Sequence, residues 1–376
     1  MTLPSTVPQH PAPARDGVLR HAHIGGLDLE TGGHLPQVTL AYETWGRLNA
    51  DASNAVLVAH ALTGSTHVAR GDTGEDGWWD ALVGPGKSVD TNRFFVVAVN
   101  MLGGCYGSTG PSSPDPQGLP WGSRFPFVTI RDSVRAEARL ADQLGIRSWH
   151  TVLGGSLGGA RALEWAVTEP DRVRRCAVIA CTAASSAEQI AFGQAQLEAI
   201  RLDPRFSGGD YYNGPTPTAG LGLARRIAHI TYRSEPELEY RFGHQPQTQE
   251  DPLGSALPAE RGRYAVESYL DHQARKLVER FDANSYLVLT EALMSHNVAR
   301  GRGSLEQALA GVTAEFFVAA VDSDRLYFPE QSEVLAAALP GSVEVHTITA
   351  PIGHDGFLTD VEQIGVPLRK RFFGSA

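Results

Sequence analysis

Hydrophobic residues are grouped in short runs that recur along much of the chain. The runs of strand length lie at residues 54–60, 94–100, 150–154, 176–181, 315–321 and 343–349. Most are continuously apolar and rich in β-branched residues, which is typical of strands buried on both faces of a largely parallel sheet. Helical spacing of apolar residues lies between them, at 132–145, 159–167 and 329–339. This alternation predicts an α/β fold with a doubly wound, mostly parallel sheet.

The alternation stops between residues 185 and 300. Patterns such as those at 185–200 and 266–281 have helical periodicity, and no buried strand is evident between them. We therefore predict a core made of residues 17–184 and 301–376, with a helical insertion at 185–300. Such an insertion would lie over the sheet as a lid that closes on a substrate, although a helical packing domain without a catalytic role is the alternative. Residues 1–16, which include several prolines, are expected to be a disordered tail.

Composition and net charge limit the kinds of partner that this protein is expected to bind. Hydrophobic residues make up 42% of the chain and charged residues 20%, which is typical of a globular protein. The formal net charge of −10 argues against a nucleic-acid partner. No apolar run reaches the roughly 20 residues of a membrane span, so no membrane partner is expected. The N-terminus lacks an apolar signal region, and Cys105, Cys176 and Cys181 form no C-x-x-C pair. We therefore expect a cytoplasmic protein without disulfides, metal or resident cofactor.

A glycine-rich segment, T-V-L-G-G-S-L-G-G-A at 151–160, follows one predicted strand and leads into a predicted helix. Gly154, Ser156 and Gly158 match the G-x-S-x-G pattern of a nucleophilic serine on a sharp strand-to-helix turn. Flanking glycines are needed there because neighbouring backbones approach closely. A tight corner without catalytic function would give the same pattern. A phosphate-binding loop is disfavoured because no G-K-[ST] follows.

A second glycine-rich segment, G-P-G-K-S at 84–88, is also a poor phosphate-binding loop. The position of its first required glycine is occupied by Ala81, and the residues that follow predict a turn rather than a helix.

A nucleophilic serine requires a histidine base and an acid later in the chain. His354 lies in a glycine-rich loop after the last predicted strand, whereas His346 alternates within that strand. Asp322 and Asp324 both follow the preceding strand, and spacing alone does not separate them.

An oxyanion hole requires two backbone N–H donors. Leu157 follows the serine at a helix start, and Leu62 lies in the loop after an early strand. The alternative for that loop is an ordinary connection beside a buried His60.

Further motifs carry a resemblance to a known family. Besides the segment around Ser156, they are H-A-L-T-G, S-D-R-L-Y-F-P, G-H-D-G-F-L, A-Y-E-T-W-G-R-L-N, G-W-W-D-A-L-V-G-P-G-K, N-M-L-G-G-C-Y-G-S-T-G-P, G-L-G-L-A-R-R-I-A-H-I-T-Y-R-S, V-E-S-Y-L and R-F-D-A-N-S-Y-L. Nearly the whole chain beyond the tail resembles the homoserine O-acetyltransferases, enzymes of methionine biosynthesis with the α/β-hydrolase fold.

The resemblance implies roles for individual residues. It selects Asp324 over Asp322 as the acid of a Ser156–Asp324–His354 triad. Arg225 would bind the carboxylate of the amino acid and Asp355 its ammonium group, with Tyr232 and Thr63 lining the site. The alternatives are that Arg225 or its neighbour Arg226 is only a solvated helix charge, that Tyr232 is a core aromatic, and that Asp355 caps a turn. Where this chain has Leu157 the family often has Met, which affects the expected shape of the acyl pocket.

The predicted activity is transfer of an acetyl group from acetyl-CoA, as co-substrate, to the hydroxyl of L-homoserine through an acyl-Ser156 intermediate. Succinyl-CoA as donor and serine as acceptor remain open at this point, as does a serine esterase on the same fold. A non-catalytic binding protein would require a broken triad. Similar enzymes are dimers, so a homodimer formed through the lid helices is expected.

Overall fold

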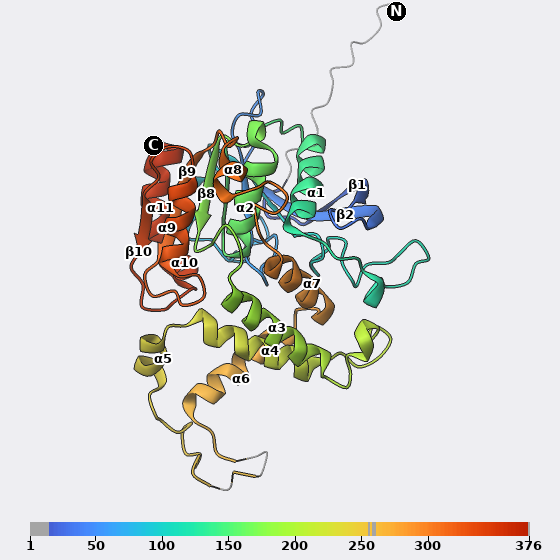
Figure 1. Cartoon of the computed structure of the whole chain (residues 1–376), viewed down its shortest axis with the longest axis vertical. Coiled ribbons are helices and arrows are strands. Elements are labelled where there is room, and N and C mark those ends of the chain that lie inside the picture. Colours follow the sequence, from blue (N-terminus) through green and yellow to red (C-terminus); the bar gives the residue numbers. More distant parts are fainter. Residues whose placement is uncertain (1–14, 255, 258–260, 375–376) are drawn as a thin grey trace, which may run out of the picture.

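The computed structural model describes residues 15–254, 256–257 and 261–374, so the predicted tail lies outside the described residues except for its last two positions. An eight-stranded sheet forms the centre of the molecule (Figure 1). In spatial order its strands are β1 (Arg20–Asp28), β2 (His34–Trp45), β6 (Phe95–Val99), β3 (Ala55–Ala59), β7 (Thr151–Gly155), β8 (Arg175–Ile179), β9 (Glu315–Val321) and β10 (Val345–Ile348). The six strands from β6 to β10 are parallel, which confirms the predicted α/β class.

All six predicted strands are present, but β1 and β2 were missed. These two strands pair antiparallel with each other, and β2 pairs antiparallel with β6. Buried and exposed residues alternate along β1, because only one of its faces packs on the core. Its apolar signal is therefore weaker than that of the buried strands.

Successive residues of the central strands point to opposite faces, and each face has its own hydrophobic core. Val97, Val152 and Val178 belong to one core, together with apolar residues of α1 (Ile130–Gln143), α2 (Leu157–Thr168) and α9 (Pro329–Ala338). Val96, Leu153 and Ile179 belong to the other, together with residues of α11 (Val361–Leu368) and the π-helical turn Arg369–Phe373. The sheet is thus covered on both sides, as the continuous apolar runs indicated.

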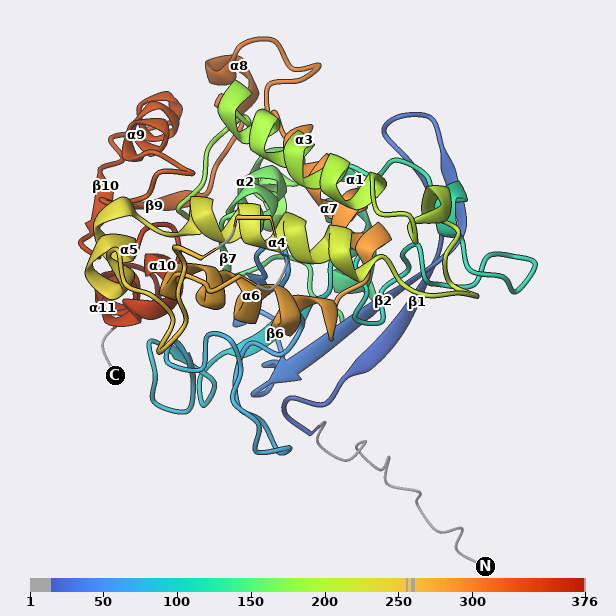
Figure 2. The same ribbon diagram turned by 90° about the horizontal axis from the view of Figure 1, so that it is seen from below.

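Between β8 and α8 (Leu305–Leu309) the described part of the chain forms five α-helices and no named strand. They are α3 (Ala187–Arg201), α4 (Thr218–Tyr232), α5 (Glu235–Phe242), α6 (Ala265–Val278) and α7 (Ala283–Met294). Helix α3 packs on α4 and α7, and α4 packs on α6. These helices lie together at one end of the molecule in Figure 1, and Figure 2, seen from that end, shows α3, α4 and α6 in front of the core. We call this helical segment the insertion.

The two ends of the insertion lie side by side. An isolated β-bridge pairs Ala184 with Asn297, and the N–H of Ser185 donates to the carbonyl of His296 at 2.9 Å. On the other side of the bridge, the N–H of Val298 donates to the carbonyl of Ala183 at 2.9 Å. The insertion therefore leaves and re-enters the core through one narrow two-stranded neck.

The remaining elements are short. They are α8 (Leu305–Leu309), α10 (Gly356–Thr359), a two-stranded ladder of β4 (Val83–Gly84) and β5 (Val89–Asp90), and 3₁₀ turns at Gly122–Arg124, Pro170–Arg172 and Ser207–Gly209. The segment G-P-G-K-S is the turn between β4 and β5, and Lys87 forms an ion pair with Asp80 at 2.9 Å rather than preceding a helix. The three cysteines, Cys105, Cys176 and Cys181, are free.

The described residues show neither a membrane-spanning helix nor a metal-binding cluster. Within them, no helix combines the length and the apolar character that crossing a membrane requires. The same residues contain no cluster of three His, Cys, Asp or Glu side chains suited to a metal ion.

Candidate active site

Ser156 lies on the sharp turn between β7 and α2. Its backbone angles, φ 58° and ψ −125°, lie in a region that residues with a side chain rarely adopt. Two glycines make the turn possible. A Cβ on Gly158 would lie 2.0 Å from the carbonyl oxygen of Ala59, and one on Gly154 would lie 2.4 Å from the backbone of Gly158. The predicted strand–turn–helix context of the G-x-S-x-G pattern is thus present, with its strain at the serine.

A buried Asp–His pair lies at the same edge of the sheet, beyond the carboxyl ends of β9 and β10. The Nδ1 atom of His354 lies 2.6 Å from Oδ2 of Asp324, and each residue is only 3% exposed. The other oxygen of Asp324 accepts the N–H groups of Leu326 and Tyr327 at 2.8 and 2.9 Å. Both oxygens of the carboxylate are therefore held, and His354 Nε2 is left as the atom that can take a proton.

The second aspartate of this loop has a different partner. Asp322 Oδ1 accepts the backbone N–H of Ala350 at 3.0 Å and thereby ties the ends of β9 and β10 together. Geometry thus separates the two acids that spacing left open. His346 lies within β10, as predicted, and bonds the carbonyl oxygen of Gln363.

The pKa of His354 is raised above its ordinary value. Burial by itself lowers the pKa of an imidazole, but the charge of Asp324 and its hydrogen bond, with a further contribution from the charge of Asp355, outweigh that effect. His354 is therefore a stronger base than an exposed histidine.

Tyr327, which is not among the residues predicted from the sequence, contacts both Ser156 and His354. Its ring stacks on the imidazole of His354 with centroids 5.1 Å apart. Burial raises the pKa of Tyr327 well above its usual value, and an interaction with the Ser156 hydroxyl opposes that rise. No hydrogen bond directly joins Ser156 and His354 among the described residues, which is common in enzymes without bound substrate. Tyr327 belongs to the S-D-R-L-Y-F-P motif, the only sequence signal that marks it.

The predicted oxyanion amides are those of Leu62, three residues beyond β3, and Leu157, the first residue of α2. In the described part of the chain, neither N–H donates to another group. His60 holds the start of the Leu62 loop, since it bonds the carbonyl of Ala61 at 2.8 Å and accepts the N–H of Met101 at 3.0 Å. Burial lowers the pKa of His60 to about 3, so it is neutral and structural.

The far end of the same loop is held by Glu43 on β2. This buried carboxylate accepts the hydroxyl of Thr66 at 2.5 Å and Nδ1–H of His67 at 2.8 Å. The other imidazole nitrogen of His67 lies 3.1 Å from the carbonyl oxygen of Glu75. Burial opposes the charged imidazole, but these hydrogen bonds prevail and raise the pKa of His67. We call these three residues, Glu43, Thr66 and His67, the loop clamp.

Arg225, Tyr232 and Thr63 come together, as predicted for a substrate site. The Arg225 guanidinium lies 5.6 Å from the centre of the Tyr232 ring, and one of its nitrogens is 3.5 Å from the Thr63 hydroxyl. Its Nε atom is buried and has no acceptor among the described residues. Arg225 and Thr63 line an open groove of about 880 Å³ whose wall also carries Lys276 and Arg280. A cation with unused donors at such a place is suited to an anionic group.

The two neighbouring arginines have different surroundings. Arg226 forms an ion pair with Asp271 at 2.8 Å, on the side of α4 that packs toward α6. Arg225 is thus the member of the pair that faces the groove.

Asp355 lies beside the site and has an ion-pair partner that was not predicted from the sequence. It forms an ion pair with Arg233 at 3.3 Å, and Arg233 also donates to the hydroxyl of Tyr269 at 3.0 Å. Burial is the main reason that the pKa of Tyr232 is raised, and the charge of Asp355 adds to that rise as it does for His354, so the carboxylate is close to both side chains. Asp355 occupies the N-cap position of α10, but its side chain accepts no capping hydrogen bond there.

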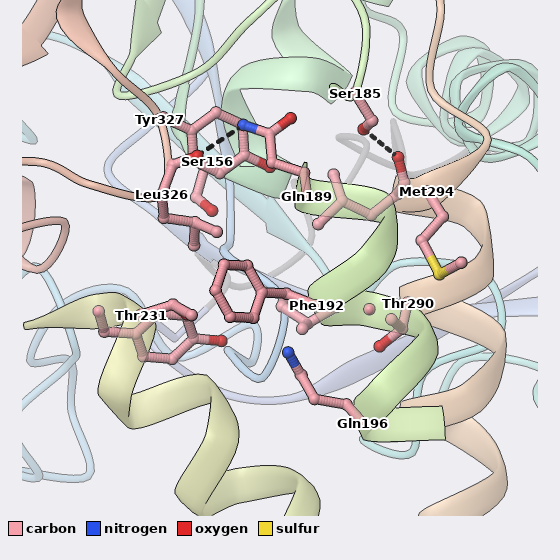
Figure 3. Close-up of a pocket in the computed structure, with 14 residues that line it drawn as sticks. Ser156, Ser185, Gln189, Phe192, Gln196, Thr231, Thr290, Met294, Leu326 and Tyr327 are labelled. Carbon is pink, nitrogen blue, oxygen red and sulfur yellow. Dashed lines mark hydrogen bonds between the residues drawn. The ribbon is translucent and has the colours of Figure 1, made fainter. Parts of the chain in front are cut away.

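A cavity of about 50 Å³ is lined by Ser156 and lies between the core and helices α3, α4 and α7 (Figure 3). Its walls join residues from six segments: Leu62, Ser156, Ser185, Gln189, Phe192, Gly193, Gln196, Thr231, Tyr232, Thr290, Leu293, Met294, Leu326 and Tyr327. Only Leu62, Ser156 and Tyr232 among them are predicted site residues, because the wall residues of α3 and α7 lie in no motif.

A serine on a strained strand-to-helix turn, beside a buried Asp–His pair at the carboxyl edge of a mostly parallel sheet, is the arrangement of the α/β-hydrolase fold. The family described as "alpha/beta hydrolase fold" matches residues 54–361. More narrowly, the chain belongs to the homoserine O-acetyltransferase family. It is 58% identical over 350 residues to homoserine O-acetyltransferase of Thermobifida fusca, covering 92% of this chain and 90% of that protein. It is 49% identical to the Corynebacterium diphtheriae homoserine O-acetyltransferase, with 94% of each chain covered.

Solved structures agree on the fold but include proteins with two different activities. Homoserine O-acetyltransferase from Bacillus anthracis superposes with a TM-score of 0.88 at 28% identity, covering 95% of this chain and 98% of that one. Esterase E22 superposes with a TM-score of 0.86, also at 28% identity, covering 94% and 99%. The fold alone therefore does not separate acyl transfer from hydrolysis.

Proposed function

We propose that this protein transfers the acetyl group of acetyl-CoA to the side-chain hydroxyl of L-homoserine, a step of methionine biosynthesis. The observation that carries the proposal is the buried Asp324–His354 pair beside Ser156 on its strained turn. The names of relatives about half identical to this chain support the choice of substrates.

In the first half-reaction Ser156 attacks the thioester carbonyl while His354 takes the hydroxyl proton. The Oγ–C bond forms, the C–S bond breaks, and the proton passes from His354 to the departing sulfur to give free CoA. Asp324 keeps the imidazole in the required tautomer and stabilises its charged form. The N–H groups of Leu62 and Leu157 stabilise the negative oxygen of the tetrahedral intermediate, and one such donor is typically worth about 3–4 kcal/mol.

In the second half-reaction the hydroxyl of homoserine attacks the acetyl ester of Ser156. His354 takes the hydroxyl proton and returns it to Oγ of Ser156 as the ester breaks. Arg225 binds the α-carboxylate, with Thr63 and Tyr232 beside it. Asp355 binds the ammonium group and shares its charge between that group and Arg233.

Hydrolysis is the competing function, because water can attack the same acyl-enzyme. The resemblance to esterase E22 is the specific observation in its favour. Transfer requires that the insertion exclude water from Ser156, and the small volume of the cavity beside Ser156 is consistent with that requirement.

An assay of CoA release with and without homoserine separates the two functions. We expect release to depend on homoserine, after a single-turnover burst without it, and double-reciprocal plots to give parallel lines. Equal steady release without the amino acid would instead establish a hydrolase. Acetyl-CoA and succinyl-CoA, each tested against homoserine and serine, identify the donor and the acceptor.

We also propose a cytoplasmic homodimer that associates through the insertion. Leu223 and Ile230 on α4 are large apolar side chains exposed on this single chain. Light scattering of the purified protein tests the association, and a monomer at micromolar concentration would exclude it.

A further inference from the structure

The loop that carries His354 is held from two sides. The core holds its first part through Asp322, which accepts the backbone N–H of Ala350 at 3.0 Å. On its other side the loop contacts residues 232–234, which connect the end of α4 to the start of α5. We call these three residues the insertion corner.

The insertion corner meets the backbone of this loop at close range. The N–H of Ser234 donates to the carbonyl of Ile352 at 3.2 Å, and its hydroxyl donates to the carbonyl of Pro351. Gly353 has a positive φ of 92°, and a Cβ there would lie 2.6 Å from the backbone nitrogen of Ser234 and 2.8 Å from the carbonyl oxygen of Tyr232. The two backbones therefore pack without space for a side chain between them.

Arg233 adds an ionic contact on the other side of the histidine. Its guanidinium pairs at 3.3 Å with Asp355, the residue after His354, and is the one ion-pair partner of that carboxylate among the described residues. The Arg233 side chain is only 12% exposed. Its Nε–H donates to the hydroxyl of Tyr269 on α6 at 3.0 Å, and Glu237 of α5 lies 3.7 Å away. Asp355 is thus held by a guanidinium that two other helices of the insertion keep in place.

These contacts lie on both sides of the base. Gly353 and Asp355 are the sequence neighbours of His354, and both contact the insertion corner. The ring of Tyr232 also packs beside the imidazole, with centroids 5.9 Å apart. Proton transfer from Ser156 requires His354 Nε2 within about 2.6–3.2 Å of the hydroxyl oxygen, and a displacement of about 1 Å can lower a rate by about 100-fold. The way in which the insertion docks on this loop therefore affects the chemical step.

We propose that the insertion corner positions the catalytic base, and that Arg233 is a positioning residue that acts through Asp355 and the His354 loop. The contribution of Asp355 to acceptor binding rests on the function proposed above. The positioning of His354 does not, because every acyl transfer to Ser156 requires the base. The insertion thus supports the chemistry of the triad in addition to binding the acceptor.

The test separates acylation from acceptor binding. p-Nitrophenyl acetate acetylates a reactive serine without any amino acid: the Oγ–C bond forms, the ester C–O bond breaks, and p-nitrophenol leaves with the hydroxyl proton. The first-turnover rate of its release therefore reports on the Ser156–His354 pair. The KM for homoserine in the acetyl-CoA reaction reports on the acceptor.

Arg233→Gln, which removes the charge that pairs with Asp355, should lower the acylation rate about tenfold and raise the KM for homoserine about fivefold. Arg233→Lys, which keeps a charge, should restore the acylation rate to within about threefold of the wild type. Ser234→Gly removes the hydroxyl contact to Pro351, and glycine is tolerated at the N-cap position that Ser234 occupies in α5. It should lower the acylation rate about threefold to tenfold.

Arg241→Gln is the matched control. Arg241 pairs with the same carboxylate, Glu237, at 2.9 Å and lies 4.9 Å from the centre of the same Tyr269 ring. It has no hydrogen bond or ion pair with the His354 loop among the described residues. The control should therefore leave the acylation rate and the KM for homoserine within about twofold of the wild type, whatever it costs in stability.

Each outcome decides a different statement. Unchanged acylation in Arg233→Gln and Ser234→Gly, at a temperature where circular dichroism shows both folded, would show that the corner does not position the base. A higher KM for homoserine with unchanged acylation would restrict Arg233 to acceptor binding, and equal losses in Arg241→Gln would make the network merely structural. If Arg233→Gln does not fold, Ser234→Gly decides. If the wild type releases p-nitrophenol but shows no homoserine-dependent CoA release, the proposed function fails while the positioning of His354 is still tested.

Discussion

Two regions meet at Ser156 and hold their residues in different ways. The core supplies Ser156, Asp324 and His354 from loops that directly follow parallel strands, and backbone hydrogen bonds fix these loops. The insertion supplies Arg225, Thr290 and other residues from helices that reach the site only through their side chains. Under the proposed function, the core carries the groups of an acyl chemistry that an esterase could share, and the insertion binds the acceptor. The following variants test that division.

Loss of the core nucleophile should have the largest effect. Ser156→Ala should lower turnover by at least about 10⁴-fold, since removing the nucleophile of such a unit abolishes the covalent route. The burst of CoA release without homoserine should disappear. Circular dichroism and thermal unfolding should show a folded protein, because the Ser156 side chain caps no helix. Residual activity above about 1% would refute an acyl-Ser156 intermediate.

Asp324→Asn should lower kcat/KM by about 10³-fold and also alter its pH dependence. His354 must be neutral to accept a proton, and its raised pKa places the acidic limb of the wild-type profile above pH 6.5. Asparagine removes the charge that raises that pKa, so the limb should move to lower pH in the variant. A pH–rate profile measured from pH 5 to 9 tests this, and an unshifted limb would show that Asp324 does not set the basicity of His354.

The core residues in these predictions could be found from the sequence, and there is a physical reason why they could. Strands buried on both faces need continuous apolar runs, and the order of serine, acid and histidine follows from the order of the strands. The half-exposed β1 and β2 lack that signal. The walls of the cavity, such as Phe192 and Thr290, are about 100 residues apart in the sequence and meet only through helix packing. Tyr327 and Arg233 were missed for the same reason, because their partners His354 and Asp355 lie in another segment.

On the insertion side, Arg225→Ala should raise the KM for homoserine by about 10²-fold, because a partly buried charge-assisted carboxylate contact is lost. The burst of CoA release without homoserine should persist, since acylation does not use the amino acid. Arg226→Ala is the matched control, because its ion pair with Asp271 points away from the groove, and it should change the KM by less than about twofold. Equal effects of the two variants would contradict the assignment of Arg225.

The smallest effect is expected from the loop clamp. Glu43→Gln weakens the contacts to Thr66 and His67 and should loosen the loop that carries Leu62. We expect kcat to fall about tenfold with little change in the KM for homoserine, because oxyanion stabilisation acts in the transition state.

Glu30→Gln is the control for the loop clamp. Glu30 is a partly buried acid that pairs with Arg131 and Arg300 away from this loop. It should lower the melting temperature without lowering kcat. If both variants lower kcat in proportion to the stability they lose, the loop clamp has no catalytic significance.

The neck formed by Ala184 and Asn297 has a consequence for how such a protein can diversify. Because the insertion begins and ends at one point, its helices can be lengthened, shortened or exchanged without altering the register of any strand. The insertion is therefore an exchangeable module, and the core can accept a different helical segment as long as Ala184 and Asn297 still pair and the new segment supplies its own insertion corner. Grafting the helical segment of a related esterase at this neck is therefore a direct way to exchange substrate selection while the triad stays in place.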